Sequence, residues 1–107
     1  MSLFLESLQQ RVLVFDGAMG TTLHALDLTL ADYNNLENCC EILNLPRPDA
    51  IGIIHEKFLK IGSDAVMTNT FGGSRMVLDD FDLGGQAHEI NKKAARIARA
   101  EARARPV

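Results

Sequence analysis

Val12-Leu13-Val14-Phe15-Asp16-Gly17-Ala18-Met19-Gly20 is the stretch on which the expected fold depends: four apolar residues in a row, then an aspartate and two glycines. A continuous apolar run that ends in turn residues is typical of a strand buried on both faces of a parallel sheet. Ala65-Val66-Met67-Thr68-Asn69-Thr70-Phe71 has a similar pattern and is followed by Gly72-Gly73. The sequence therefore predicts two strands, at residues 12–15 and 65–71.

An amphipathic helix is predicted between the two strands, over residues 48–62. Pro48 and Asp49 suit the first turn of a helix, and Gly62 stands where a left-handed residue would end it. The apolar residues of this segment recur at intervals of three and four: Ile51, Ile54, Phe58 and Ile61. A strand, a crossover helix and a second strand make a βαβ unit.

The rest of the chain is expected to be helical or irregular. A short helix or an extended arm is predicted at residues 3–8, and one helical turn near residues 22–26 lies in a long irregular connection. A short helical piece at 74–81 precedes a long Ala-rich helix at 86–104, and Arg105-Pro106-Val107 resembles the approach to another strand. Two strands with two covering helices do not enclose a core, so we expect self-association or, in preference, a piece of a larger α/β domain.

Composition narrows the class of protein. The 107 residues make one domain or part of one, and 47% hydrophobic with 23% charged residues is typical of a globular protein. The net charge of −3 argues against nucleic acid or an anionic membrane as a partner. The two cysteines are adjacent, which does not indicate a secreted disulfide scaffold, and no run reaches the roughly 18 to 20 apolar residues of a membrane span. We therefore expect a cytoplasmic protein.

The loop after the first predicted strand is the first candidate site. Functional groups of parallel α/β folds gather at the carboxyl ends of the strands. Asp16 could hold an ammonium group or polarise a nucleophile there, Gly17 and Gly20 would let backbone N–H groups approach a ligand, and Thr21 and Thr22 add hydroxyl donors. The alternative is an ordinary tight turn that Asp16 caps.

The second predicted strand ends in a comparable way. Thr68-Asn69-Thr70-Phe71 offers two hydroxyls and an amide beside an aromatic ring, a suitable lining for a small polar substrate. The alternative is a Thr-rich strand whose side chains alternate between the sheet and solvent. Because the two loops take the same position in successive βα units, the pair favours a binding site over either alternative.

Other features favour structural roles. The glycine spacing misses G-x-G-x-x-G and there is no Gly-Lys-Ser/Thr, which excludes the common phosphate-binding loops. Cys39 and Cys40 are adjacent rather than two to four residues apart, and the three histidines are scattered, so we expect no metal-ligating residue. The basic residues of the last predicted helix favour a solvated outer face over a contact with RNA or an acidic partner: Lys92, Arg96, Arg99 and Arg103.

Several ordered motifs also occur together along the chain. They are residues 12–21, the stretch Asn38-Cys39-Cys40-Glu41-Ile42-Leu43-Asn44 with Arg47-Pro48-Asp49 and Ile54-His55 after it, and Gly62-Ser63-Asp64 before Thr68-Asn69-Thr70-Phe71-Gly72. As a set they resemble the start of the homocysteine methyltransferase family. The likeness covers nearly the whole chain and is greatest to the N-terminal homocysteine-binding region of the cobalamin-dependent branch.

The resemblance implies a fold and a chemistry. The fold would be the N-terminal portion, about the first two β/α units, of a TIM (β/α)8 barrel, with residues 1–107 an incomplete homocysteine-binding barrel domain. In the family, a zinc ion held by three cysteine thiolates binds the homocysteine sulfur as a thiolate, which then accepts a methyl group and gives methionine. In this branch the methyl donor is methylcobalamin; the chemistry of the residues leaves betaine or a sulfonium compound open as the donor. The implied partners are homocysteine and the remainder of the barrel or the other modules of the enzyme.

The resemblance also implies site residues. Homocysteine would contact the first loop and the end of the second strand: Asp16, Gly17, Ala18, Met19, Gly20, Thr21, Asn69, Thr70 and Phe71. The zinc cysteines of the family lie far downstream, and Cys39-Cys40 are not their equivalents. We therefore expect a homocysteine S-methyltransferase fragment without catalytic or metal-binding residues, inactive in isolation. The alternative is a small non-catalytic α/β module that forms oligomers or binds a partner.

Overall fold

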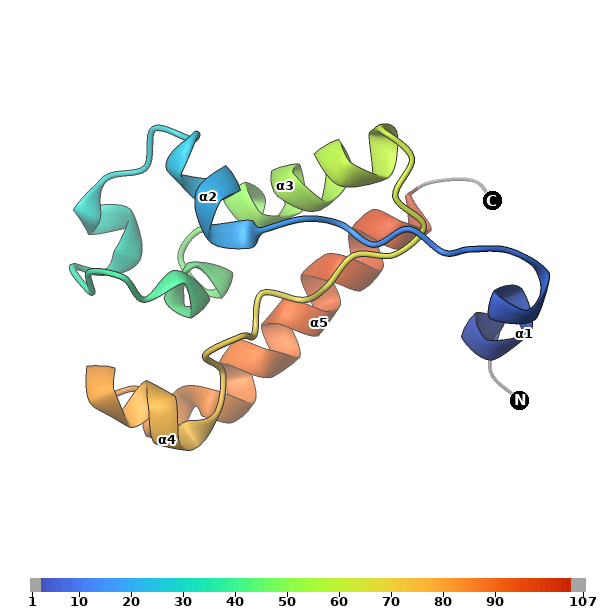
Figure 1. Ribbon diagram of the computed structural model, residues 1–107. Helices are drawn as coiled ribbons and strands as arrows, with labels where there is room; N and C mark the ends of the chain where they lie inside the picture. The colour runs from blue at the N-terminus through green and yellow to red at the C-terminus, as the bar shows by residue number, and fades with distance from the viewer. Residues whose placement is uncertain (1–2, 105–107) are drawn as a thin grey trace.

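The computed structural model describes residues 3–104, and this part of the chain is built from helices (Figure 1). The α-helices are α1 Leu3–Gln10, α2 Met19–His24, α3 Pro48–Lys60, α4 Arg75–Leu78 and α5 Ala87–Arg103. Short 3₁₀ helices lie between them: η1 Leu30–Tyr33, η2 Cys40–Asn44, η3 Asp79–Phe81 and η4 Gly84–Gln86. The two longest helices, α3 and α5, pack against each other.

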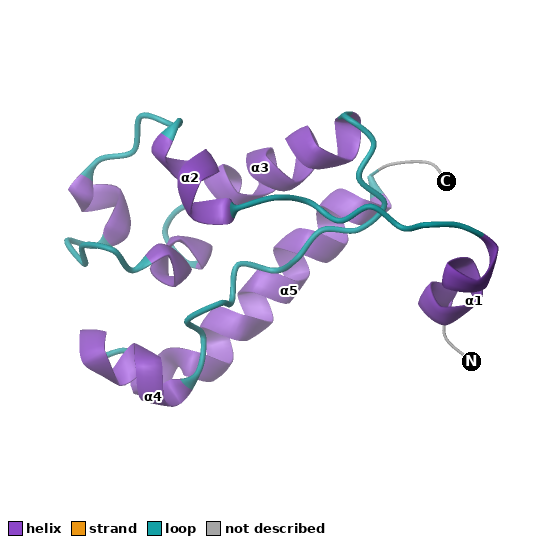
Figure 2. Cartoon of the chain, in the orientation of Figure 1, coloured by secondary structure: helices purple, strands orange, loops and turns teal. Residues whose placement is uncertain are grey.

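The prediction of an α/β fold, as the first units of a TIM barrel, is wrong. Residues 3–104 contain no β-strand, and both predicted strands are drawn as loops in Figure 2. Phe15 and Ala65 form one isolated parallel bridge. The apolar runs are not buried on two faces either, because Val12 is 83% exposed and Phe71 is fully exposed. The alternative, a small non-catalytic module, was also predicted to be α/β, and the same finding contradicts that fold.

Two aspartate side chains explain why the pairing stops at one bridge. Beside the bridge, the N–H of Ala65 donates to the carbonyl of Val14 (3.3 Å) and the N–H of Asp16 donates to the carbonyl of Ala65 (3.1 Å). On one side of it the N–H of Val14 donates to the carboxylate of Asp64 (2.9 Å), and on the other the N–H of Met67 donates to that of Asp16 (3.2 Å). These carboxylates accept from the donors that would otherwise continue a ladder.

The apolar core lies between helices instead of on a sheet. One cluster joins α2, η2, α3 and α5 and consists of Leu23, Leu43, Ile51, Ile54 and Ile97. A second joins η2, α4 and α5 and includes Cys39, Ile42, Leu78, Leu83 and Ile90. Helix α5 turns one face to this core, where Ile90, Ala94, Ile97 and Ala98 are buried. Its basic residues are exposed, as expected: Lys92, Arg96, Arg99 and Arg103.

The predicted helices are confirmed with small shifts of their ends. The central helix begins at Pro48 and ends just before Gly62, whose φ of 111° suits glycine alone. The short predicted helices correspond to α1, α2, and α4 with η3. The predicted approach to a strand at residues 105–107 lies outside the described residues. No helix in residues 3–104 is both long and apolar enough to span a bilayer.

Candidate functional site

One cavity of about 940 Å³, here called the loop cavity, gathers most of the predicted site residues. Eight of the nine line it: Asp16, Gly17, Ala18, Met19, Gly20, Asn69, Thr70 and Phe71. Thr21 does not line the cavity and is exposed on α2. The bridge between Phe15 and Ala65 holds the two loops next to each other, since each loop follows one of its residues. The expected proximity of the loops is therefore real, although the sheet expected to cause it is absent from residues 3–104.

Further residues line the cavity that sequence reasoning did not assign to it. They are Asn38, Cys40, Glu41, Met67, Thr68, Gly72, Val77, Asp80 and Phe81. Thr68 stood in the motif of the second loop, and the first three stood in the stretch that carried the family resemblance. Val77, Asp80 and Phe81 come from α4 and η3, where no local pattern distinguishes them from other helix residues.

Asp16 combines a structural contact with free binding capacity. Its two carboxylate oxygens each lie 3.2 Å from the N–H of Met67, which ties the first loop to the second. An ionised carboxylate has about four lone-pair sites, so one backbone donor leaves most of them available. Asp16 can therefore hold the loops together and still accept hydrogen bonds from a cationic ligand.

Asn69 is buried and fixes the shape of the second loop. Its side-chain amide donates to the carbonyl of Cys40 (2.9 Å) and to the side-chain oxygen of Asn44 (3.0 Å). The amide of Asn44 in turn donates to the backbone carbonyls of Asn69 (3.0 Å) and Ile90 (3.3 Å). Because both amide donors of Asn69 are used within the chain, this side chain binds the loop to η2 and, through Asn44, to α5.

The rim of the cavity is held by two further contacts. The N–H of Gly72 donates to the carboxylate of Glu41 (3.1 Å), and the hydroxyls of Thr68 and Thr70 lie 2.7 Å apart. The side chain of Phe71, which lies between Thr70 and Gly72 in the sequence, is fully exposed to solvent. The second loop thus has a fixed backbone and an exposed aromatic side chain at the cavity.

The charge of the lining favours a cationic group. In the described part of the chain three carboxylates line the cavity, those of Asp16, Glu41 and Asp80, and no lysine or arginine does. Cys40 adds no thiolate at neutral pH, because burial and the nearby charge of Glu41 raise its pKa. An anionic group would have only neutral donors to bind to here, such as the backbone N–H groups of residues 17–20 and the side chains of Asn38, Thr68 and Thr70.

The described residues do not fit a zinc ion. Within residues 3–104 no group of three or more His, Cys, Asp and Glu side chains is placed to hold a metal. Cys39 and Cys40 are free thiols, and Cys39 is buried in the second core cluster. His24 and His88 are exposed, whereas His55 is buried in α3.

Comparison with known proteins gives a consistent result. The family model of homocysteine S-methyltransferase matches residues 13–107. Over 95 residues, which are 89% of the chain, the sequence is 50% identical to a methionine synthase of Mycobacterium tuberculosis and 46% identical to a methionine synthase of Mycobacterium leprae. The chain spans about 8% of the length of each of these relatives.

Proposed function

Because the chain belongs to the homocysteine S-methyltransferase family, we propose that it is the N-terminal homocysteine-binding part of a methionine synthase-like enzyme. Residues 1–107 would form an incomplete homocysteine-binding domain of that enzyme. The observation that supports this most is the loop cavity, in which residues 16–20 and 69–71 surround one space although about fifty residues separate them in sequence. The short share of its relatives that the chain covers agrees with a part of a longer protein.

In this proposal the loop cavity holds the amino-acid end of homocysteine. The ammonium group would lie against the carboxylate of Asp16, because a charge-assisted hydrogen bond to a carboxylate is stronger than a neutral one. The carboxylate of the substrate would accept from backbone N–H groups of Gly17 to Gly20, the donors nearest to Asp16 in the chain. Asn69, Thr70 and Phe71 would line the side-chain end. No role is proposed for Thr21, which lies outside the cavity.

The chemistry of methyl transfer would need groups from other parts of the enzyme. The homocysteine sulfur must lose its proton before it attacks a methyl group, and a nearby positive charge favours that loss. The loop cavity supplies carboxylates, which oppose it. We therefore propose that zinc and methylcobalamin bind outside residues 3–104, in a parent enzyme of the cytoplasm, and that this chain alone is inactive.

Exposed apolar side chains support the proposal that other parts of an enzyme cover this chain. Val12, Met67, Phe71 and Met76 are all largely exposed in the described part of the chain. Of these, Met67 and Phe71 lie together at the loop cavity, and we take this exposed apolar surface as part of what the rest of the enzyme would cover. The remainder of the domain or the other modules of the enzyme are the proposed partners.

Binding of homocysteine is tested by NMR on the ¹⁵N-labelled chain. Titration with L-homocysteine under reducing conditions is expected to shift the amide signals of residues 16–20 and 69–72. Asp16→Asn should weaken binding about tenfold or more, because loss of a charge-assisted hydrogen bond costs about 1.5–3 kcal/mol. The asparagine oxygen can still accept from Met67, so the loops should keep their place. Asp27→Asn is the control, since Asp27 is exposed and lines none of the cavities described.

Three results would contradict the proposal. The first is an absence of shifts in the two loops at millimolar homocysteine, and the second is an unchanged affinity in the Asp16→Asn variant. The third concerns activity: the isolated chain should form no methionine from homocysteine and methylcobalamin, and should not bind zinc tightly at one ion per chain. Turnover or stoichiometric zinc binding would show that the chain holds catalytic groups of its own.

A further inference from the structure

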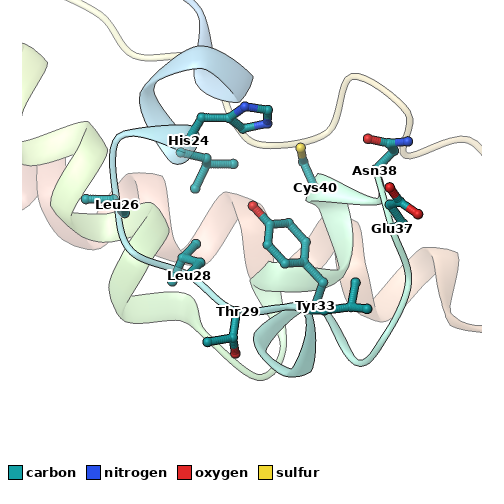
Figure 3. Close-up of a pocket in the computed structure, with 10 residues that line it drawn as sticks. His24, Leu26, Leu28, Thr29, Tyr33, Glu37, Asn38 and Cys40 are labelled. Atoms are coloured by element: carbon teal, nitrogen blue, oxygen red, sulfur yellow. The ribbon is translucent and has the colours of Figure 1, made fainter.

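A second cavity, here called the leucine pocket, lies beside the loop cavity and has a volume of about 380 Å³. It shares only Asn38 and Cys40 with the loop cavity. Leu23, Leu26, Leu28, Leu30 and Tyr33 are among its lining residues. Figure 3 labels Leu26, Leu28 and Tyr33 at this pocket. The volume falls within the range of small-molecule sites, about 300–1,000 Å³.

The walls of the leucine pocket are anchored to the core. Leu23 is fully buried in the first core cluster, and Leu26, Leu28 and Tyr33 pack against that cluster. The segment that carries Leu30 and Tyr33 is fixed at its start by a capping box, in which Thr29 and Asp32 bond to each other's backbone N–H groups. The pocket is therefore preformed, which lowers the entropy that a ligand would lose on binding.

Polar groups of the pocket are left for a ligand to use. Figure 3 shows the Tyr33 hydroxyl directed toward His24 and Cys40, with Glu37 and Asn38 at the other end of the pocket. Among residues 3–104 the structure gives the Tyr33 hydroxyl no hydrogen bond. Burial, together with nearby negative charge, raises the pKa of Tyr33, so its hydroxyl is neutral at neutral pH.

The charged side chains of the leucine pocket favour a ligand of one charge. Among residues 3–104, Glu37 is the one carboxylate that lines the pocket, and no lysine or arginine lines it. An anion would be repelled by this carboxylate, although His24, Tyr33 and Asn38 also line the pocket and can donate hydrogen bonds, whereas a cation would pair with it. The face of the Tyr33 ring also favours a cation within about 6 Å.

We propose that the leucine pocket binds a small organic amine. Its apolar body lies among the leucines and against Tyr33, and its ammonium group faces the carboxylate of Glu37. The site goes beyond the proposed function and does not depend on it, because the residues that would hold homocysteine line the other cavity.

The chain carries its own probe for this site. Tyr33 is the only tyrosine and there is no tryptophan, so the tyrosine fluorescence of the full chain arises within the pocket. Three probes of matched shape are titrated at pH 8: cyclohexylmethylamine, cyclohexylmethanol and cyclohexanecarboxylate. The amine is expected to change the fluorescence saturably, the alcohol to bind about tenfold more weakly, and the carboxylate not to bind.

Glu37→Gln separates the charge from the apolar contacts. This variant should weaken amine binding about tenfold and leave the affinity for the alcohol unchanged, because the shape of the pocket is kept. Glu89→Gln, an exposed glutamate of α5 outside the pocket, is the control and should bind the amine normally. Circular dichroism of each variant checks that the helices are retained.

The proposal is overturned if the amine fails to bind, if all three probes bind alike, or if Glu37→Gln leaves amine binding unchanged. A failure here is distinguishable from a failure of the homocysteine proposal. The amine is followed through Tyr33, whereas homocysteine is followed through the amide signals of residues 16–20 and 69–72, and Asp16→Asn should not affect the amine.

Discussion

His55 lies on α3 with no exposed surface, and within residues 3–104 neither nitrogen of its ring has a hydrogen-bond partner. Burial lowers the pKa of His55, and the charge of Asp16 opposes this only in part. The unfolded chain therefore binds a proton near pH 6.5 that the folded chain does not bind until a lower pH. Stability should be fully present above about pH 7 and should fall as the pH drops through 6.5.

The measurement is the free energy of unfolding by urea at pH 8, 7, 6 and 5. We expect His55→Leu to reduce the loss of stability between pH 7 and pH 5, whose slope for one histidine is at most about 1.4 kcal/mol per pH unit. His88→Gln, an exposed histidine at the start of α5, should keep the slope of the original chain. An equal slope in the His55→Leu variant and the original chain would rule out His55 as its source. Carboxyl groups whose pKa is lowered in the folded chain, such as Asp64, change the stability only at more acidic pH.

At the same scale, residue type and position predicted part of the site. Asp16 and the glycines after it could be identified as candidate site residues, because an aspartate and glycines that follow an apolar run usually form either a turn or a binding loop. Asp80 and Phe81 were not identifiable, since they reach the cavity from η3 through tertiary packing. The bonding of Asn69 to Asn44 was equally invisible, because twenty-five residues separate the two amides.

Helices are the elements that the sequence predicted best. The segment at 48–62 has a period, a proline at its start and a glycine after its end, and all three are local signals. Strands need partners over several residues, and an apolar run does not show whether a partner is present. Here the carboxylates of Asp16 and Asp64 take the backbone donors on either side of the bridge, so the predicted strands are extended loops.

The stripe of α3 gives a test at the scale of the element. Ile54 is completely buried between α3 and its neighbours, whereas Ile61, predicted for the same stripe, is 79% exposed just beyond the helix end. We expect Ile54→Ala to lower the free energy of unfolding by about 2–5 kcal/mol, because it removes buried methyl groups and leaves a cavity. Ile61→Ala should change it by less than about 0.5 kcal/mol. Urea unfolding of the two variants measures the difference, and similar losses would show that the predicted stripe, with Ile61 inside it, was correct.

The whole molecule carries apolar surface that its own helices do not cover. Val12, Ile61 and Met76 are each about four-fifths exposed, and they belong to different segments of the chain. Helix α1 has no buried residue, and Figure 1 shows it apart from α3 and α5. With a net charge of only −3, electrostatic repulsion between copies is weak.

We therefore expect the isolated chain to associate reversibly as its concentration rises, because apolar surface leaves water when copies meet. Val12→Ser combined with Met76→Ser should lower the association constant about tenfold or more, since burying one such side chain is worth about 1.5–3 kcal/mol. Gln86→Ser, a polar and exposed position, is the control. Sedimentation velocity over a hundredfold range of concentration measures the effect. A single monomeric boundary at every concentration would mean that exposing this surface to water costs little free energy. The proposal that other parts of a longer enzyme cover this surface would then lose its support.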